Sequence, residues 1–139
     1  MNSYKFDDIS VGLEEHFSVK VDADKLDKFL EISGDTNPLH TDSKYSKSKG
    51  FVDRVAYGML TSSFYSTLVG VYLPGKYCIL QGIDIQFSKP VYIEDKLKIS
   101  GKVTYINEAY KQLEIKATIV NQENKKVSKA TIKVGVMDE

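Results

Sequence analysis

Residues 58–71 read GMLTSSFYSTLVGV, and this stretch decides the fold. Its side chains are apolar or small, apart from the hydroxyl groups of Ser, Thr and Tyr. The run is longer than an ordinary strand, so the pattern predicts a largely buried helix. We expect Gly70 to end this helix and Pro74-Gly75 to form the turn after it.

The chain before this helix predicts a strand and then an amphipathic helix. Residues 11–21 alternate between apolar and polar side chains, as a half-buried strand does. Asp22 or Asp24 is placed to cap a helix, and the apolar residues that follow fall on one helical face. Gly34 is positioned to end it.

A polar loop and a short helix connect these elements to the buried helix. The loop covers residues 35–40, where Pro38 is expected to forbid helical continuation and to bias Asn37 toward an extended backbone. A short helix is expected around residues 43–48.

The second half of the chain reads as antiparallel strands. Its segments are rich in Ile, Val, Tyr and Thr, and they alternate between an apolar and a polar face. Turns are predicted at Asn107-Glu108 and at residues 121–124. The expected strands are 77–87, 91–106, 110–121 and 126–136.

This order predicts one α+β domain over residues 1–139. A long apolar helix escapes water only if a sheet curls around it, so the fold expected is a central helix wrapped by an antiparallel sheet. Such a sheet leaves two free edges, and pairing with a second copy of the chain is a common way to cover them.

Composition and charge exclude several classes of protein. Nineteen Lys and Arg residues balance nineteen Asp and Glu residues, and no basic stripe is visible, which disfavours nucleic acid as a partner. Cys78 is the single cysteine, and no Cys/His set offers metal ligands. Without a secretory signal or a membrane-spanning run, the chain is expected to be cytoplasmic with no membrane partner.

Two groups of residues carry possible chemistry. Asp35 and His40 place a carboxylate and an imidazole in one short loop, where they can handle a proton or hold a water between them. The residue types of this loop are also common in ordinary turns, where Asp and Asn bond to the local backbone. Gly58 opens the buried helix, where its N–H suits a developing oxyanion, although a glycine there can equally serve close packing.

The stretch FLEISGDTNPLH at residues 29–40 resembles the signature of the MaoC-like dehydratases, the (R)-specific enoyl-CoA hydratases. Every element of the family pattern is present: an aromatic, an aliphatic, a small residue, Gly-Asp-x-Asn-Pro-aliphatic-His and a downstream small residue. The likeness extends over nearly the whole chain, through Ser46, Gly50-Phe51, residues 56–60, residues 73–75, residues 87–91 and Asp95.

The resemblance implies a hot-dog fold and a homodimer or higher homo-oligomer, with the active site close to the subunit interface. It also implies that Asp35 and His40 hold the catalytic water and that the Gly58 N–H binds the thioester oxygen. The substrate pocket it implies is lined by Asn37, Tyr57, Met59, Ser62 and Ser66. One departure stands out, because this chain has Tyr57 where the family usually has histidine.

The activity implied is reversible hydration of a 2-enoyl thioester to a (3R)-hydroxyacyl thioester. The substrate carrier is coenzyme A or acyl carrier protein, and no metal or other cofactor is expected. Two alternatives remain open at this point: a hot-dog acyl-CoA thioesterase, and a non-catalytic acyl-thioester-binding subunit, which the tyrosine at position 57 would favour.

Overall fold

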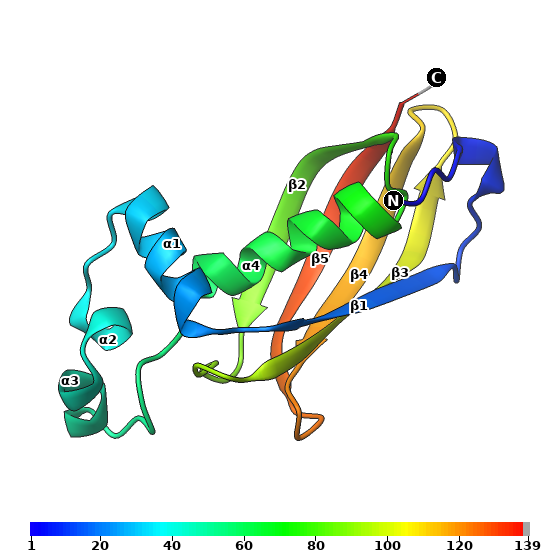
Figure 1. Cartoon of the computed structure of the whole chain (residues 1–139). Coiled ribbons are helices and arrows are strands. Elements are labelled where there is room, and N and C mark those ends of the chain that lie inside the picture. The colour runs from blue at the N-terminus through cyan, green and yellow to red at the C-terminus, as the bar shows by residue number, and fades with distance from the viewer. Residues whose placement is uncertain (138–139) are drawn as a thin grey trace.

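One antiparallel sheet wraps around a long helix in the computed structural model, which describes residues 1–137 (Figure 1). The strands are β1 Glu14–Lys20, β2 Cys78–Phe87, β3 Lys96–Asn107, β4 Gln112–Val120 and β5 Lys126–Val136. The helices are α1 Ala23–Ser33, α2 Pro38–Thr41, α3 Ser43–Ser48 and α4 Gly58–Thr67, with a 3-10 turn η1 Phe6–Asp8 and a π-helical segment η2 Leu68–Tyr72. The sheet order is β1-β3-β4-β5-β2, and every neighbouring pair is antiparallel. The predicted α+β class and hot-dog architecture are confirmed.

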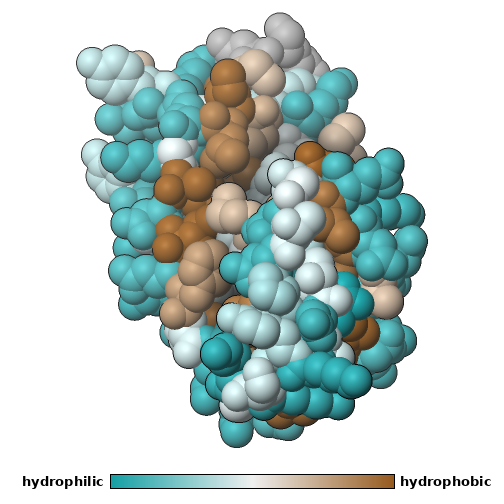
Figure 2. Space-filling view, turned by 90° about the vertical axis from the view of Figure 1, so that its left-hand side faces the viewer, coloured by the Kyte–Doolittle hydropathy of each residue, from teal (hydrophilic) through white to brown (hydrophobic). Residues whose placement is uncertain are grey.

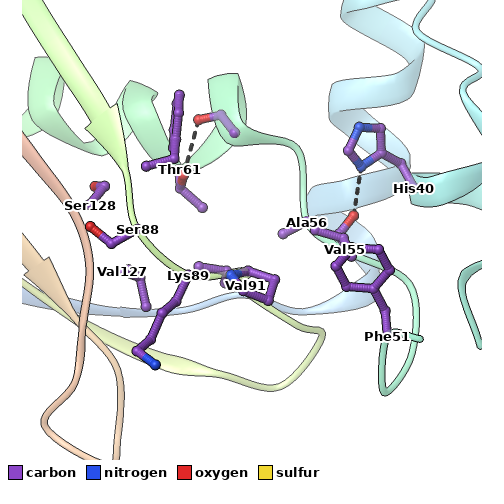
Figure 3. A pocket seen from close by; sticks show the side chains of 13 residues that line it. His40, Phe51, Val55, Ala56, Thr61, Ser88, Lys89, Val91, Val127 and Ser128 are labelled. Carbon is purple, nitrogen blue, oxygen red and sulfur yellow. Dashed lines mark hydrogen bonds between the residues drawn. The ribbon is translucent and has the colours of Figure 1, made fainter. Parts of the chain in front are cut away.

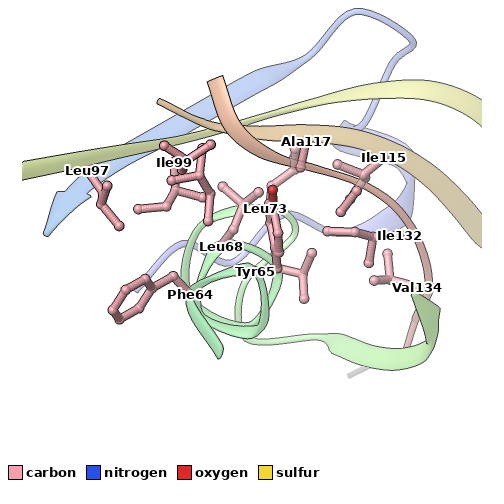
Figure 4. Close-up of a cluster of buried hydrophobic side chains, with 14 of the residues drawn as sticks. Phe64, Tyr65, Leu68, Leu73, Leu97, Ile99, Ile115, Ala117, Ile132 and Val134 are labelled. Carbon is pink, nitrogen blue, oxygen red and sulfur yellow. The ribbon is translucent and has the colours of Figure 1, made fainter. Parts of the chain in front are cut away.

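The core lies between α4 and the sheet (Figure 4). Phe64 and Tyr65 come from α4 and Leu68 from η2, and the sheet presents Leu97, Ile99, Ile115, Ala117, Ile132 and Val134. Each fully buried Leu or Ile contributes about 1.5–3 kcal/mol by leaving water. Gly101 allows this close approach, because a Cβ atom there would lie 2.7 Å from Leu68 Cδ2.

Helix α1 begins and ends where the sequence predicts. The side chain of Asp22 accepts a hydrogen bond from the Lys25 N–H at 2.9 Å, which caps the first turn. Gly34 follows the last turn with a φ of 68°, in the left-handed region that glycine enters without strain. These two residues set the position at which the polar loop leaves the helix.

Two expectations about helix ends are wrong. Gly70 does not end the buried helix, because the chain continues through it as η2 and the Leu73 N–H donates to Leu68 O at 2.8 Å. The predicted loop over residues 35–40 is also too long: α1 does not continue through Pro38, but Pro38 begins a new helix, α2, where its missing N–H costs no intrahelical bond. His40 therefore lies in a single helical turn and not in a loop.

The predicted strand over residues 91–106 begins too early. Residues 92–95 form a turn, in which Asp95 Oδ2 accepts from the Tyr92 N–H at 2.9 Å and the Asp95 N–H donates to Tyr92 O at 3.1 Å. The strand starts only at Lys96, after this turn. The other three strands and both predicted turns lie within a few residues of their predicted places.

The sheet has two free edges, β1 and β2. Strand β2 carries exposed apolar side chains, namely Ile79, Leu80, Ile83 and Phe87. Within residues 1–137, no helix has the length and apolar character needed to cross a membrane.

Candidate active site

His40 is held by two contacts, one at its ring and one at its main-chain carbonyl. Its Nδ1 atom lies 2.7 Å from the carbonyl oxygen of Val55, and its own carbonyl accepts from Arg54 Nε at 2.6 Å. A carbonyl oxygen only accepts hydrogen bonds, so Nδ1 carries the proton in this contact. With Nδ1 engaged by this contact, Nε2 is the ring nitrogen that remains available for chemistry.

The short helix that holds His40 is anchored through the carbonyl of Leu39. That oxygen accepts from the Ser46 hydroxyl at 2.8 Å and from the Val55 N–H at 3.1 Å. Ser46 is fully buried, so its hydroxyl has no competing water. This contact explains why a small hydroxyl residue stands downstream of the loop.

Asp35 and Asn37 shape the loop before His40. Asp35 Oδ1 accepts from the Asn37 N–H at 3.1 Å, and Asn37 Oδ1 accepts from the Leu39 N–H at 2.9 Å. The second contact caps α2. Both residues are exposed in the single chain, so the Asp35 carboxylate keeps free acceptor capacity on its other oxygen.

Tyr57 connects this loop to the start of α4. Its hydroxyl donates to the Asp35 carbonyl at 2.8 Å, and its ring centre lies 4.2 Å from that of His40 and 4.9 Å from that of Phe29. The residue is only 2% exposed. Burial, with a smaller effect of the Asp35 charge, raises the pKa of the Tyr57 phenol, so it stays a neutral donor.

Gly58 presents its N–H at the beginning of α4. As the first residue of the helix it has no intrahelical acceptor, and the helix dipole favours negative charge at this end. Its carbonyl, in contrast, accepts from the hydroxyls of Thr61 at 3.0 Å and Ser62 at 2.7 Å. The N–H is therefore free to bind an oxygen from a ligand.

A cleft of about 340 Å³ brings His40 and Gly58 together (Figure 3). Its wall comes from the segment before α4, from the first turn of α4, from the end of β2 and from the start of β5. The lining is mostly apolar, and Lys89 adds an ammonium group. The lining residues are His40, Phe51, Val55, Ala56, Gly58, Thr61, Phe87, Ser88, Lys89, Pro90, Val91, Val127 and Ser128.

The remaining predicted pocket residues do not line this cleft within one chain. Met59 is 66% exposed and Ser66 is also exposed. Ser62 is buried, with its hydroxyl bonded to the helix. Asn37 acts as a helix cap and Tyr57 packs inside the fold, so for these residues a role at the substrate stays a prediction.

Several cleft residues were not predicted as site residues. Phe87, Ser88 and Lys89 stand in a stretch that carried the family resemblance, so a signal for them existed. The sequence carried no such signal for Val127 and Ser128. They reach the cleft because β2 and β5 pair with Phe87 opposite Ser128.

The chain is similar to several known proteins. A family model described as "MaoC like domain" matches residues 9–132. The chain is 33% identical over 100 residues to an (R)-specific enoyl-CoA hydratase from Aeromonas caviae, covering 72% of this chain and 75% of that protein. It is 31% identical over 98 residues to a 3-hydroxybutyryl-CoA dehydratase from Methylorubrum extorquens, covering 70% of this chain and 62% of that protein.

A solved structure agrees over almost the whole chain. The unliganded R-hydratase from Pseudomonas aeruginosa superimposes with a TM-score of 0.91 at 27% identity, covering 97% of this chain and 86% of that one. The fold, the Asp35–His40 segment and the family model point the same way. The chain belongs to the MaoC-like domain family.

Proposed function

We propose that the chain is an (R)-specific 2-enoyl-thioester hydratase that also catalyses the reverse dehydration. One observation carries this proposal: His40 and Gly58, the first residue of α4, line the same apolar cleft, and the loop that bears Asp35 leads directly into the helical turn of His40. A proton acceptor, a water-orienting ring and an oxyanion donor are the three groups that hydration of an enoyl thioester needs. The curated relatives act in the same chemical class by their names.

In the proposed reaction, the Asp35 carboxylate takes a proton from a water molecule that His40 Nε2 orients. The water oxygen bonds to C3 of the enoyl group, and the double-bond electrons move onto the thioester oxygen. The Gly58 N–H stabilises this enolate oxygen, a contribution on the order of 2.7–4 kcal/mol for one such donor. The enolate then collapses as C2 accepts the proton, so water is added with no net change in oxidation state.

The proposed substrate is an acyl thioester of coenzyme A or of acyl carrier protein. The apolar wall of the cleft suits an acyl chain, and Lys89 suits an anionic carrier. The proposed steps use only side chains and main-chain groups of this protein, so we propose that no cofactor takes part. A cytoplasmic location remains a prediction from the sequence.

We propose that the active form is a homodimer or higher homo-oligomer. On the face seen in Figure 2, apolar side chains form a band beside a hollow in an otherwise polar surface. Large apolar side chains are strongly exposed in the single chain, among them Ile32 of α1, Met59 of α4 and Phe87, which lines the cleft. Pairing of two copies along the free edge of β2 would cover such groups and shield the exposed Asp35 from bulk water.

The test is a spectrophotometric assay of the purified protein with short and medium enoyl thioesters on both carriers. The proposal predicts loss of the enoyl absorbance without thiol release, and a product of (3R) configuration. Release of thiol without loss of that absorbance would identify a thioesterase instead. Binding of the thioester without turnover in either direction would identify a non-catalytic subunit.

A further inference from the structure

Tyr57 makes contacts with three separate parts of the candidate site. Its main chain begins α4, since its carbonyl accepts from the N–H groups of Leu60 and Thr61, and the next residue is the oxyanion donor Gly58. Its hydroxyl holds the Asp35 carbonyl, and its ring packs on the ring of His40. Among residues 1–137, no other residue is described with contacts to the Asp35 carbonyl, to the His40 ring and to the first turn of α4.

We propose that Tyr57 is a positioning residue that sets the distance between the Asp35–His40 pair and the Gly58 N–H. This inference rests on the proposed hydratase function. Water must be activated on one side of the substrate while the thioester oxygen is held on the other, so the two halves of the site need a fixed separation. Tyr57 supplies it from one rigid, buried side chain.

The burial of Tyr57 separates this role from a direct contact with substrate. The side chain is 2% exposed, it does not line the cleft, and its hydroxyl is already bonded to the Asp35 carbonyl. The ring is held from its other side by Phe29 of α1. Tyr57 is therefore placed to hold the parts of the site together and not to contact the substrate.

The test compares Tyr57→Phe with Tyr4→Phe as a matched control. Both substitutions delete one tyrosine hydroxyl and its single hydrogen bond, since Tyr4 donates to Glu15 Oε1 at 2.7 Å, away from the cleft. Both keep the ring, so Tyr57→Phe preserves packing on His40. Two readouts are measured: kcat and KM for crotonyl-CoA hydration, and amide hydrogen exchange of residues 35–42.

For Tyr57→Phe we expect kcat to fall about 5- to 50-fold with KM within about twofold. Exchange of residues 35–42 should rise about fivefold or more, because the loop loses its link to α4. Tyr4→Phe should change neither readout. The exchange measurement needs no activity, so an inactive wild-type protein would count against the hydratase proposal alone.

Three outcomes would overturn the inference. Unchanged exchange in Tyr57→Phe would show that the hydroxyl does not hold the loop. Faster exchange with unchanged kcat would show that the link does not matter for catalysis. A rise in KM with kcat intact would make Tyr57 a binding residue.

Discussion

The Nδ1 atom of His40 donates to the carbonyl oxygen of Val55 across 2.7 Å, and this contact fixes the tautomer of the ring. The N–H of Val55 donates to the Leu39 carbonyl, and Val55 lies three residues before Gly58. The main chain that orients the histidine thus runs directly into α4, which begins at Gly58. In the proposed reaction, the orientation of water by His40 and the stabilisation of negative charge by Gly58 would be coupled through a few residues of backbone.

Replacing His40 with asparagine should separate the role of Nδ1 from the role of Nε2. The amide nitrogen of Asn can still donate to Val55 O, but nothing takes the place of Nε2. We expect His40→Asn to lose kcat by about 100-fold or more while the melting temperature changes little. His40→Ala should lose a similar amount of activity and be less stable as well. Retention of more than a tenth of wild-type kcat in His40→Asn would exclude Nε2 from the reaction.

Gly58→Ala should alter substrate binding through Phe87. The added Cβ atom would lie 3.1 Å from two ring carbons of Phe87, which lines the cleft and is 56% exposed. Because the exposed ring can move, we expect little loss of stability and a KM raised several-fold. Gly70→Ala is the control, since no atom lies within 4 Å of its Cβ position. Equal effects of the two substitutions on KM would contradict this view of the cleft.

The thiol of Cys78 should react slowly in the folded protein. Burial raises its pKa from 9.0 to about 11, so at pH 8 the thiolate fraction is about 100-fold smaller than in the unfolded chain. Labelling with a disulfide reagent should slow accordingly. Because the folded pKa is the higher one, the stabilising contribution is full below pH 9 and is lost as the pH rises toward 11. Equal labelling rates with and without denaturant would contradict the assignment.

Asp22 should stabilise the fold only while it is ionised. The hydrogen bond that its carboxylate accepts from the Lys25 N–H lowers the pKa of Asp22 below 3.8. Its contribution to the free energy of unfolding is therefore present above pH 3.8 and is lost as the pH falls through the pKa of the folded state. Asparagine caps helices about equally well but carries no charge. In urea titrations, wild type should exceed Asp22→Asn in unfolding free energy at pH 7, and the difference should vanish at strongly acidic pH. A difference in unfolding free energy that persists at strongly acidic pH would contradict a contribution from the charge of Asp22.

Local signals in the sequence predicted local structure well. Asp22 and Gly34 bound α1 because an N-cap and a left-handed C-terminal residue are decided by a few neighbouring residues. Residues 38–40 were predicted as loop although they begin α2, because proline both ends helices and begins them, and the cap from Asn37 decides between the two. Gly70 was misread because burial of its neighbours Leu68 and Val69 holds the segment helical despite the weak helix propensity of glycine.

The candidate site could be predicted only in part. Asp35, His40 and Gly58 could be proposed because they stand in short motifs, and of these three His40 and Gly58 line the cleft while Asp35 does not. Ser128 was not, since it reaches the cleft through the β2–β5 register, which the alternation of apolar residues does not specify. The contact of Tyr57 with the Asp35 carbonyl depends on how the loop folds back on α4, and no spacing in the sequence encodes it.

The most direct test of the central claim is the turnover of crotonyl-CoA by Asp35→Asn beside the wild-type protein. Asparagine retains the oxygen that accepts from the Asn37 N–H, so the loop and the fold should persist, as circular dichroism and thermal melting can verify. Because the amide cannot take a proton from water, we expect kcat to fall by about 10²–10⁴-fold. Near-normal hydration by a folded Asp35→Asn variant would contradict the account.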